Sequence, residues 1–191
     1  MKTSFASNLS HFGVFCHDVD KMATFYRSVF EPQMTKHGPD ARLTQLGIEL
    51  PKAVSPAANY VPARQRGSLI YIAGQVPTAG GKDKYVGKVG QDVSIDDAQK
   101  AARLCAINIL AQLRTALGGS LDGVAGCVRL GGFVNATPEF GDHPMVINGA
   151  SDLMVEVFGE AGLHGRTAVG CNSLPRNVAV QVDAIFELAR Q

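Results

Sequence analysis

Residues 166–188 read RTAVGCNSLPRNVAVQVDAIFEL, which is the pattern of two β-strands joined by a Leu-Pro turn. In the second strand apolar residues recur at every second position, while Gln181, Asp183 and Glu187 lie between them. The apolar row consists of Val178, Val180, Val182, Ala184 and Phe186. Successive side chains of a strand point to opposite faces, so we expect this row beneath helices. The regular polar row is predicted to lie at a partly hydrated subunit interface.

Two amphipathic helices are the clearest elements upstream of these strands. Ser94 precedes Ile95-Asp96-Asp97, a Ser-x-x-Asp variant of the capping box, and apolar spacing continues to about Leu117 before a Gly-Gly pair. A second helix is predicted from about His143 to Phe158, and it stops at the glycines that follow.

The other segments complete a mixed pattern of strands and helices. Leu69–Ala73 is predicted to be a buried strand, a short strand is expected around Tyr85–Lys88, and residues 126–136 form another strand. Paired glycines in the last of these suggest a bulge or a close backbone approach. Residues 31–41 are predicted as a linker and residues 42–67 as a proline-rich, extended approach. This order predicts an α+β fold with both helices on one face of a sheet. The other face is expected to be covered by oligomerisation.

Composition limits the classes of function. The chain has 191 residues, 46% of them hydrophobic, and a formal net charge of +1, which predicts one compact domain with a short appendage. The absence of a basic run argues against nucleic acid and anionic membrane as partners. No apolar stretch reaches the roughly 18 residues of a membrane-spanning helix. Four cysteines without a C-x-x-C pair, and no signal-peptide pattern, favour a reducing cytoplasm and free, buried thiols.

Four blocks of sequence together carry a resemblance to a known family. They are VPARQRGSLIYIAGQVP, GKVGQDVSIDDAQKAARLCAINILAQL, NGASDLMVEVFGEAG and RTAVGCNSLPRNVAVQVDAIFEL. In this order they resemble the Rid family of reactive-intermediate deaminases, also called the YjgF family, and its chorismate-mutase-like branch. The resemblance covers residues 41–191 and leaves residues 1–40 as the appendage.

The resemblance implies a chorismate-mutase-like homotrimer, in which three sheets enclose a central barrel and ligand clefts lie between adjacent subunits. Arg166 matches the arginine that binds the substrate carboxylate through a two-pronged ion pair in deaminating members. The backbone at Ala168 would bind the nitrogen end of the substrate. Tyr60, Gly74 and Asn148 match residues that line the same cleft. The implied ligand is a small carboxylate-bearing metabolite, with no metal and no cofactor.

Gln181 departs from the family pattern. It occupies the position of a glutamate that orients and activates the water attacking an imine carbon. An amide orients water but does not accept its proton as a carboxylate does. Asp183 lies on the same face roughly 6 to 7 Å further along the strand and is a candidate to compensate. Imine hydrolysis is intrinsically easy, so positioning alone could still accelerate it.

Each of these residues also has a purely structural interpretation. Arg166 could be a surface ion-pair partner, and Gln181 and Asp183 could form interface hydrogen bonds. Tyr60 could pack its ring at the start of a strand, and Asn148 could cap the second helix. The sequence leaves both interpretations open.

The appendage carries a second resemblance. SHFGVFCHDVDKMATFYRSVF, residues 10–30, resembles the opening strand and helix of the vicinal-oxygen-chelate, or glyoxalase-like, family, where a histidine at the place of His11 is a metal ligand. One ligand does not make a metal site. We therefore interpret residues 1–40 as a truncated remnant that could cover the mouth of a cleft.

Three functions follow as hypotheses. The first is hydrolytic deamination of a small carboxylate-bearing enamine or imine, with Arg166 as the anchor and water held by Gln181 or Asp183. The second is non-catalytic carboxylate binding or metabolite sensing, which the missing glutamate favours. The third, RNA cleavage, is a label that some family members carry, and the near-neutral charge argues against it.

Overall fold

The computed structural model describes residues 38–54 and 59–189, and the predictions for residues 10–30 lie outside this part. The elements are, in order, α2 (Pro39–Gln45), β1 (Ala63–Arg66), β2 (Leu69–Gln75), β3 (Thr78–Ala79), β4 (Lys82–Asp83), α3 (Ile95–Ala116), β5 (Val124–Asn135), α4 (His143–Phe158), the 3-10 helix η1 (Gly159–Gly162), β6 (Gly165–Cys171), the 3-10 helix η2 (Pro175–Asn177) and β7 (Val180–Leu188).

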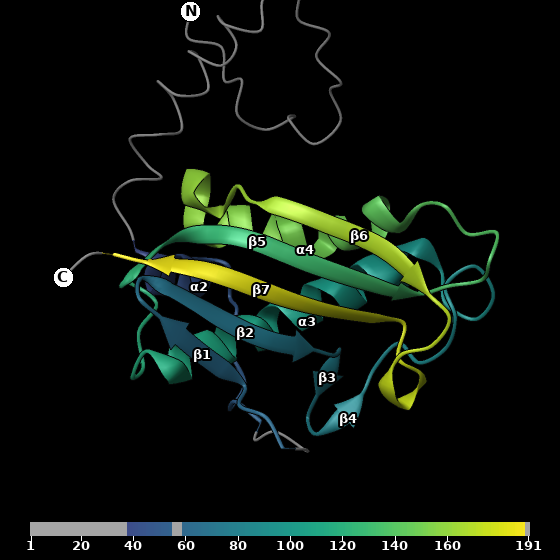
Figure 1. Ribbon diagram of the computed structural model, residues 1–191, viewed down its shortest axis with the longest axis horizontal. Helices are drawn as coiled ribbons and strands as arrows, with labels where there is room; N and C mark the ends of the chain where they lie inside the picture. Colours follow the sequence, from purple (N-terminus) through teal and green to yellow (C-terminus); the bar gives the residue numbers. More distant parts are fainter. Residues whose placement is uncertain (1–37, 55–58, 190–191) are drawn as a thin grey trace, which may run out of the picture. The chain divides into compact units, whose positions relative to one another are not determined.

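Five strands form one mixed sheet in the order β1-β2-β7-β5-β6, and β3 and β4 form a separate small hairpin (Figure 1). β7 is antiparallel to both β2 and β5, whereas β6 runs parallel to β5 after the crossover through α4. β1 and β6 are therefore the two edges of the sheet. β7 is the last strand of the described chain, yet it lies at the centre.

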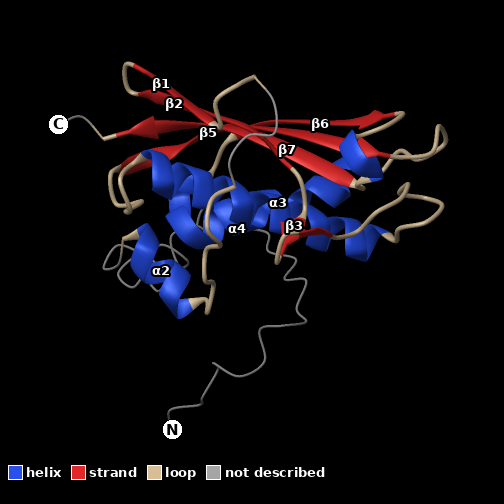
Figure 2. Cartoon of the chain, turned by 90° about the horizontal axis from the view of Figure 1, so that it is seen from below, coloured by secondary structure: helices blue, strands red, loops and turns tan. Residues whose placement is uncertain are grey.

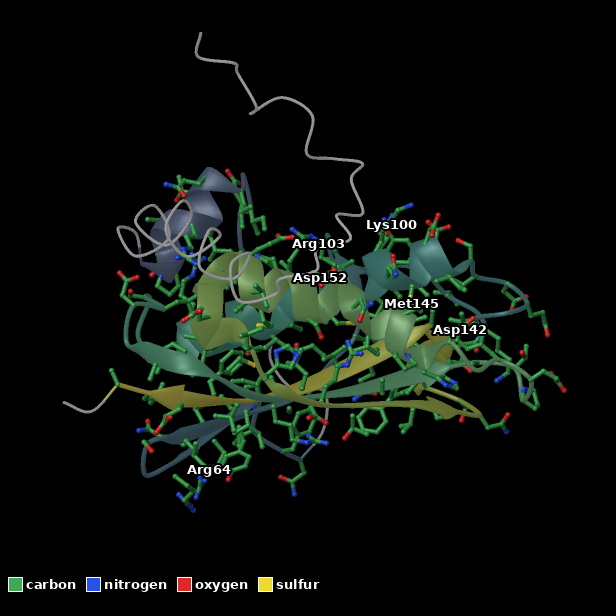
Figure 3. The ribbon with its side chains drawn as sticks, turned by 90° about the horizontal axis from the view of Figure 1, so that it is seen from above. Arg64, Lys100, Arg103, Asp142, Met145 and Asp152 are labelled. Carbon is green, nitrogen blue, oxygen red and sulfur yellow. The ribbon has the colours of Figure 1, made fainter. Side chains whose placement is uncertain are left out.

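Both long helices cover the same face of the sheet, and no helix of residues 38–54 or 59–189 lies on the opposite face (Figure 2). The alternation predicted for β7 is confirmed, because Val180, Val182, Ala184 and Phe186 are buried against the helices. On the bare face Tyr71 is 43% exposed and Val169 is 41% exposed. Figure 3 shows Arg64 on this bare side and Arg103 and Asp152 on the helix side.

The helix boundaries follow from local capping. Ser94 is the N-cap of α3, and its side chain accepts a hydrogen bond from the backbone N–H of Asp97, as the capping pattern predicts. α4 begins at His143, with Pro144 in its first turn, where a missing N–H costs no helical hydrogen bond. It ends at Phe158, and the capping residue Gly159 has a φ of 64°, which favours a residue without a side chain.

Two glycines bring α4 close to its neighbours. A Cβ at Gly149 would overlap the backbone carbonyl oxygen of Gln99, so α4 and α3 meet backbone against backbone. A Cβ at Gly132 would lie 2.5 Å from Cγ1 of Ile147, a fully buried residue of α4. The predicted close approach in β5 is thus confirmed at Gly132. The register shifts of β5 occur nearer its start, between Val124 and Arg129.

A buried polar network fixes one end of the sheet. Asn135 is fully buried, and its amide donates to the carbonyl oxygens of Gly87 and Val178 and to Oδ1 of Asn177. Nζ of Lys88 donates to Oδ1 of Asn135 and to backbone carbonyl oxygens beyond β5 and β6. Every donor of this network has an acceptor, as buried polar groups require.

Two local predictions were wrong. Residues 39–41, predicted as the end of a linker, and residues 42–45, expected to be extended, belong to α2, which is stabilised by packing of its buried Leu43 in the core. The strand expected around Tyr85–Lys88 is absent from the described structure. Tyr85 has a φ of 53°, which interrupts an extended chain, and Val86 forms only an isolated bridge with Val178. The short hairpin β3-β4 lies just before it.

We expect Gly149→Ala to lower the free energy of unfolding by about 1 to 3 kcal/mol, because the added methyl group overlaps the α3 backbone. Gly123→Ala is the matched control, since a Cβ there meets nothing within 4 Å. Urea unfolding of both variants measures the difference. Equal stabilities would contradict the close packing of α3 and α4.

Candidate functional site

Arg166 projects from the edge strand β6 toward α4. It pairs in register with the buried Leu130, so its side chain lies on the helix-covered face of the sheet. Nη1 donates to Oδ1 of Asn148 at 2.8 Å and to Oγ of Ser151 at 3.0 Å. Asn148 and Ser151 are three positions apart on α4 and therefore share one face of that helix. The sequence-predicted pair Arg166 and Asn148 is thus brought together.

The hydrogen bonds of Arg166 leave its two-pronged edge free. A guanidinium has five N–H donors, and the two on Nη1 are both used. No other residue of the described ranges accepts from Nε or Nη2 of Arg166. The same edge of Arg176 binds Asp83, with Nε to Oδ2 at 2.7 Å and Nη2 to Oδ1 at 2.8 Å. That pair holds the pKa of the Asp83 carboxyl below its usual value. Arg166 can bind a carboxylate from outside the described chain in this geometry.

Ala168 lies two residues further along β6 and is half-buried. It pairs in register with Gly132 on the β5 side, so its side chain points the same way as that of Arg166. Since β6 is an edge strand, one row of its backbone N–H and C=O groups has no neighbouring strand within the described chain. Such a row can bind a polar group of a ligand or a second chain.

Gln181 and Gly74 form a second group, on the bare face of the sheet. Gln181 pairs in register with Phe133, whereas the adjacent Val180 and Val182 are buried under the helices. A Cβ at Gly74 would overlap Nε2 of Gln181, so the missing side chain makes room for the amide. Tyr60 is 49% exposed and lies two residues before Pro62, whose carbonyl accepts a hydrogen bond from the N–H of Ala73. It therefore belongs to the β2 side of the sheet.

Asp183 is held by an arginine that the sequence analysis did not single out. Its Oδ1 lies 3.0 Å from Nη1 of Arg129, and both side chains remain partly exposed. A Cβ at Gly131 would lie 2.7 Å from the same carboxylate oxygen, so Gly131 gives the ion pair its space. Asp183 therefore has a partner before any ligand binds.

The seven predicted residues fall into two groups within one chain. Arg166, Asn148 and Ala168 lie at the β6 edge, and the first of these points to the helix side. Gly74, Gln181 and Asp183 lie on the bare face, over β2 and β7, and the seventh residue, Tyr60, lies on the β2 side of the sheet. The strand β5 separates the groups, so one chain alone does not bring Arg166 and Gln181 to a common ligand.

A pocket of about 470 Å³ lies further along β6. It is lined by Ala136, Thr137, Pro138, Phe140, His143, Gly170, Cys171 and Asn172. Burial raises the pKa of its Cys171 thiol. Burial also raises the pKa of Cys105 and brings that of Cys127 to about 12. All three thiols are free and are protonated at neutral pH.

The described residues contain neither a candidate metal site nor a candidate membrane-spanning helix. His, Cys, Asp and Glu side chains there form no group of three or more that could hold a metal ion. None of the helices in that part of the chain combines the length and the apolar character needed to cross a membrane.

Two contact residues escaped the sequence analysis. Ser151 could have been found from its spacing, because it follows Asn148 by three positions on a predicted helix. Arg129 could have been found from the strand pattern only with the register of β5 against β7, which the shifts near its start conceal.

A mixed sheet with both long helices on one face is the α+β fold of the chorismate-mutase-like class of proteins. A model of the family described as "YjgF/chorismate_mutase-like, putative endoribonuclease" matches residues 40–188. The chain belongs to this family, which confirms the resemblance seen in its sequence. The matched region does not include residues 10–30, and the glyoxalase-like resemblance of that segment gains no support.

Known proteins resemble the chain over the same region. Protein TCP17 of Trypanosoma cruzi is 44% identical over 149 residues, which are 78% of this chain and 92% of that protein. The structure of Atu1372 from Agrobacterium tumefaciens, a protein of unknown function, is 48% identical with a TM-score of 0.74, and the match covers 79% and 92% of the two chains. A "putative endoribonuclease" from Shewanella oneidensis is 36% identical with a TM-score of 0.77, covering 80% and 100%.

More distant structures share the fold alone. E. coli TdcF, solved with bound serine, is 20% identical with a TM-score of 0.53, and the match covers 72% of this chain and 94% of that one.

We expect Gly74→Ala to displace the Gln181 amide while lowering the free energy of unfolding by only about 0.5 kcal/mol, because the end of a glutamine side chain moves easily. A crystal structure of the variant, with urea unfolding beside it, checks both parts. A Gln181 side chain in its original place would show that the two residues are not in contact.

Proposed function

We propose that the protein hydrolyses a small enamine or imine that carries a carboxylate, and releases ammonia and a keto acid. The single observation that carries this proposal is the guanidinium of Arg166, held by Asn148 and Ser151 with its Nε and Nη2 edge free. A bidentate ion pair with a carboxylate is the interaction that this edge makes best. TdcF with bound serine supports a small carboxylate-bearing ligand for this fold.

The reaction needs little more than a positioned water. Water adds to the imine carbon, the C=N electron pair moves to nitrogen, and the proton from water is transferred to that nitrogen. As the carbinolamine collapses, its C–N bond breaks, the hydroxyl proton is transferred to the departing nitrogen, and the C=O bond forms as ammonia leaves. An enamine such as 2-aminoacrylate enters this sequence after it tautomerises to the imine, with its N–H proton moving to the β-carbon. Gln181 can orient the water through its amide but does not accept the proton, so a second water carries it. Orientation alone predicts a modest rate enhancement.

A cleft between chains is part of this proposal. Arg166 at the β6 edge and Gln181 on the bare face are separated in one chain, and a homotrimer would bring the Arg166 group of one subunit to the Gln181 group of the next. The exposed Tyr71, Val128 and Val169 give the bare face apolar area to bury in such an assembly. The free thiols fit a cytoplasmic location, which we include in the proposal.

Binding without turnover is the second candidate function. Gln181 in place of a carboxylate favours it, as does the ion pair that engages Asp183 with Arg129. Tight binding of a keto acid, combined with ammonia release no faster than in buffer, would distinguish this candidate from the enzyme.

We expect Arg166→Ala to abolish the acceleration of ammonia release from freshly generated 2-aminoacrylate, since the substrate loses its anchor. Arg166→Lys should lose at least about tenfold in kcat/KM, because an ammonium cannot form the two parallel hydrogen bonds. A coupled assay with a pyridoxal-phosphate-dependent dehydratase as the source of 2-aminoacrylate measures both variants.

Arg114→Ala is the matched control for Arg166→Ala. Arg114 is partly buried near the end of α3, and its side chain makes no hydrogen bond with another described residue. Its variant should retain the wild-type rate. Ammonia release at that rate from Arg166→Ala would refute the proposed mechanism.

Gln181→Glu should raise the rate of imine hydrolysis by about tenfold or more, because a carboxylate accepts the proton of the attacking water. Gln65→Glu adds the same charge on β1 and should leave the rate unchanged. An unchanged rate in Gln181→Glu would remove position 181 from the site of water attack.

A further inference from the structure

A chain of hydrogen bonds runs from Arg166 back into the protein through Ser151 and His164. Oγ of Ser151 lies 3.0 Å from Nη1 of Arg166 and 3.1 Å from Nε2 of His164. Nδ1 of His164 lies 2.6 Å from the carbonyl oxygen of Gly162, a buried residue. All three side chains are at least partly accessible, so a ligand at Arg166 would lie close to this chain.

The direction of each hydrogen bond in this chain is fixed. The Gly162 carbonyl oxygen is only an acceptor, so Nδ1 of His164 carries a hydrogen and donates the hydrogen bond. In the neutral ring Nε2 is then an acceptor, and the Ser151 hydroxyl donates a hydrogen bond to it. The Ser151 oxygen is left to accept from Arg166, which only donates. A serine with no such acceptor could instead rotate its hydroxyl away from the guanidinium.

We propose that Ser151 and His164 are positioning residues that hold Nη1 of Arg166 and so turn its Nε and Nη2 edge toward the substrate carboxylate. This inference rests on the proposed function of Arg166 and adds two residues to the same site. Neither residue touches the reacting atoms. Their effect is on carboxylate affinity, and so on KM, with little change in kcat.

Other charged side chains on the elements packed here are accounted for within the described ranges. Glu156 of α4 pairs with Arg103 of α3, and Arg129 of β5 pairs with Asp183 on the bare face. Asp152 on α4 and Glu160 on η1 are exposed. None of these six described side chains forms a hydrogen bond with His164 or Ser151. Among the charged side chains of the described residues, Arg166 alone shares Ser151 as a hydrogen-bond partner with His164.

The test measures pyruvate binding by calorimetry, which needs no turnover. Ser151→Ala should weaken binding about 3- to 10-fold, and Ser151→Thr, which keeps the hydroxyl, should restore it. His164→Ala should also weaken binding about 3- to 10-fold, because the Ser151 hydroxyl loses its acceptor, and His164→Gln, which keeps an acceptor, should restore it.

Two variants serve as matched controls. Asp152→Asn changes the residue next to Ser151 on α4, where the side chain has no partner among the described residues, and should bind pyruvate as the wild type does. His143→Ala removes the other described histidine and should also bind pyruvate as the wild type does. Circular dichroism shows whether each variant is folded, and His164→Ala, with rescue by Ser151→Thr and His164→Gln, keeps the test decisive if Ser151→Ala is not.

The outcomes separate this inference from the proposed function. Wild-type binding by both Ser151→Ala and His164→Ala, with binding lost in Arg166→Ala, would overturn the positioning role and leave the anchor in place. Wild-type binding by Arg166→Ala, or no binding of pyruvate or serine by the wild-type protein, would overturn both.

Discussion

The structure depends on how closely α4 packs against its neighbours. Gly149 lets α4 meet the backbone of α3, and Gly132 lets Ile147 press onto β5. These two contacts fix the height of α4 above the sheet and its rotation about its own axis. The rotation in turn decides that Asn148 and Ser151, and not their neighbours on the helix, meet Arg166. Packing in the core thus sets the direction of a charged group at the edge.

The sheet separates the functional candidates because a strand alternates its side chains. Arg166 belongs to the row that faces the helices, whereas Gln181 and Asp183 belong to the row that faces away. A ligand that contacts both must lie where the β6 edge of one chain meets the bare face of another. The proposed chemistry therefore depends on assembly, because a lone subunit offers only half of the proposed cleft.

Much of the fold could be predicted from the sequence, since periodicity and capping are local. The helix starts at Ile95 and His143 and the alternation of β7 were predicted correctly. α2 was missed because its stability comes from Leu43 in the core, and the positive φ of Tyr85 has no signal in the residue type. The family resemblance placed Arg166 and Asn148 at one cleft, and the structure adds the hydrogen bond between them. The partners Arg129, Ser151 and His164 depend on strand register and helix rotation, which are not local properties.

The central place of β7 has a consequence for the order in which the chain folds. β2 and β5 are each hydrogen-bonded to β7, so neither can complete its ladder until the last described strand has been synthesised. A nascent chain lacking residues 180–188 would hold two half-sheets with unpaired inner edges, the kind of surface that aggregates. Termination of the chain before residue 180 would therefore be as damaging as the loss of a much longer segment.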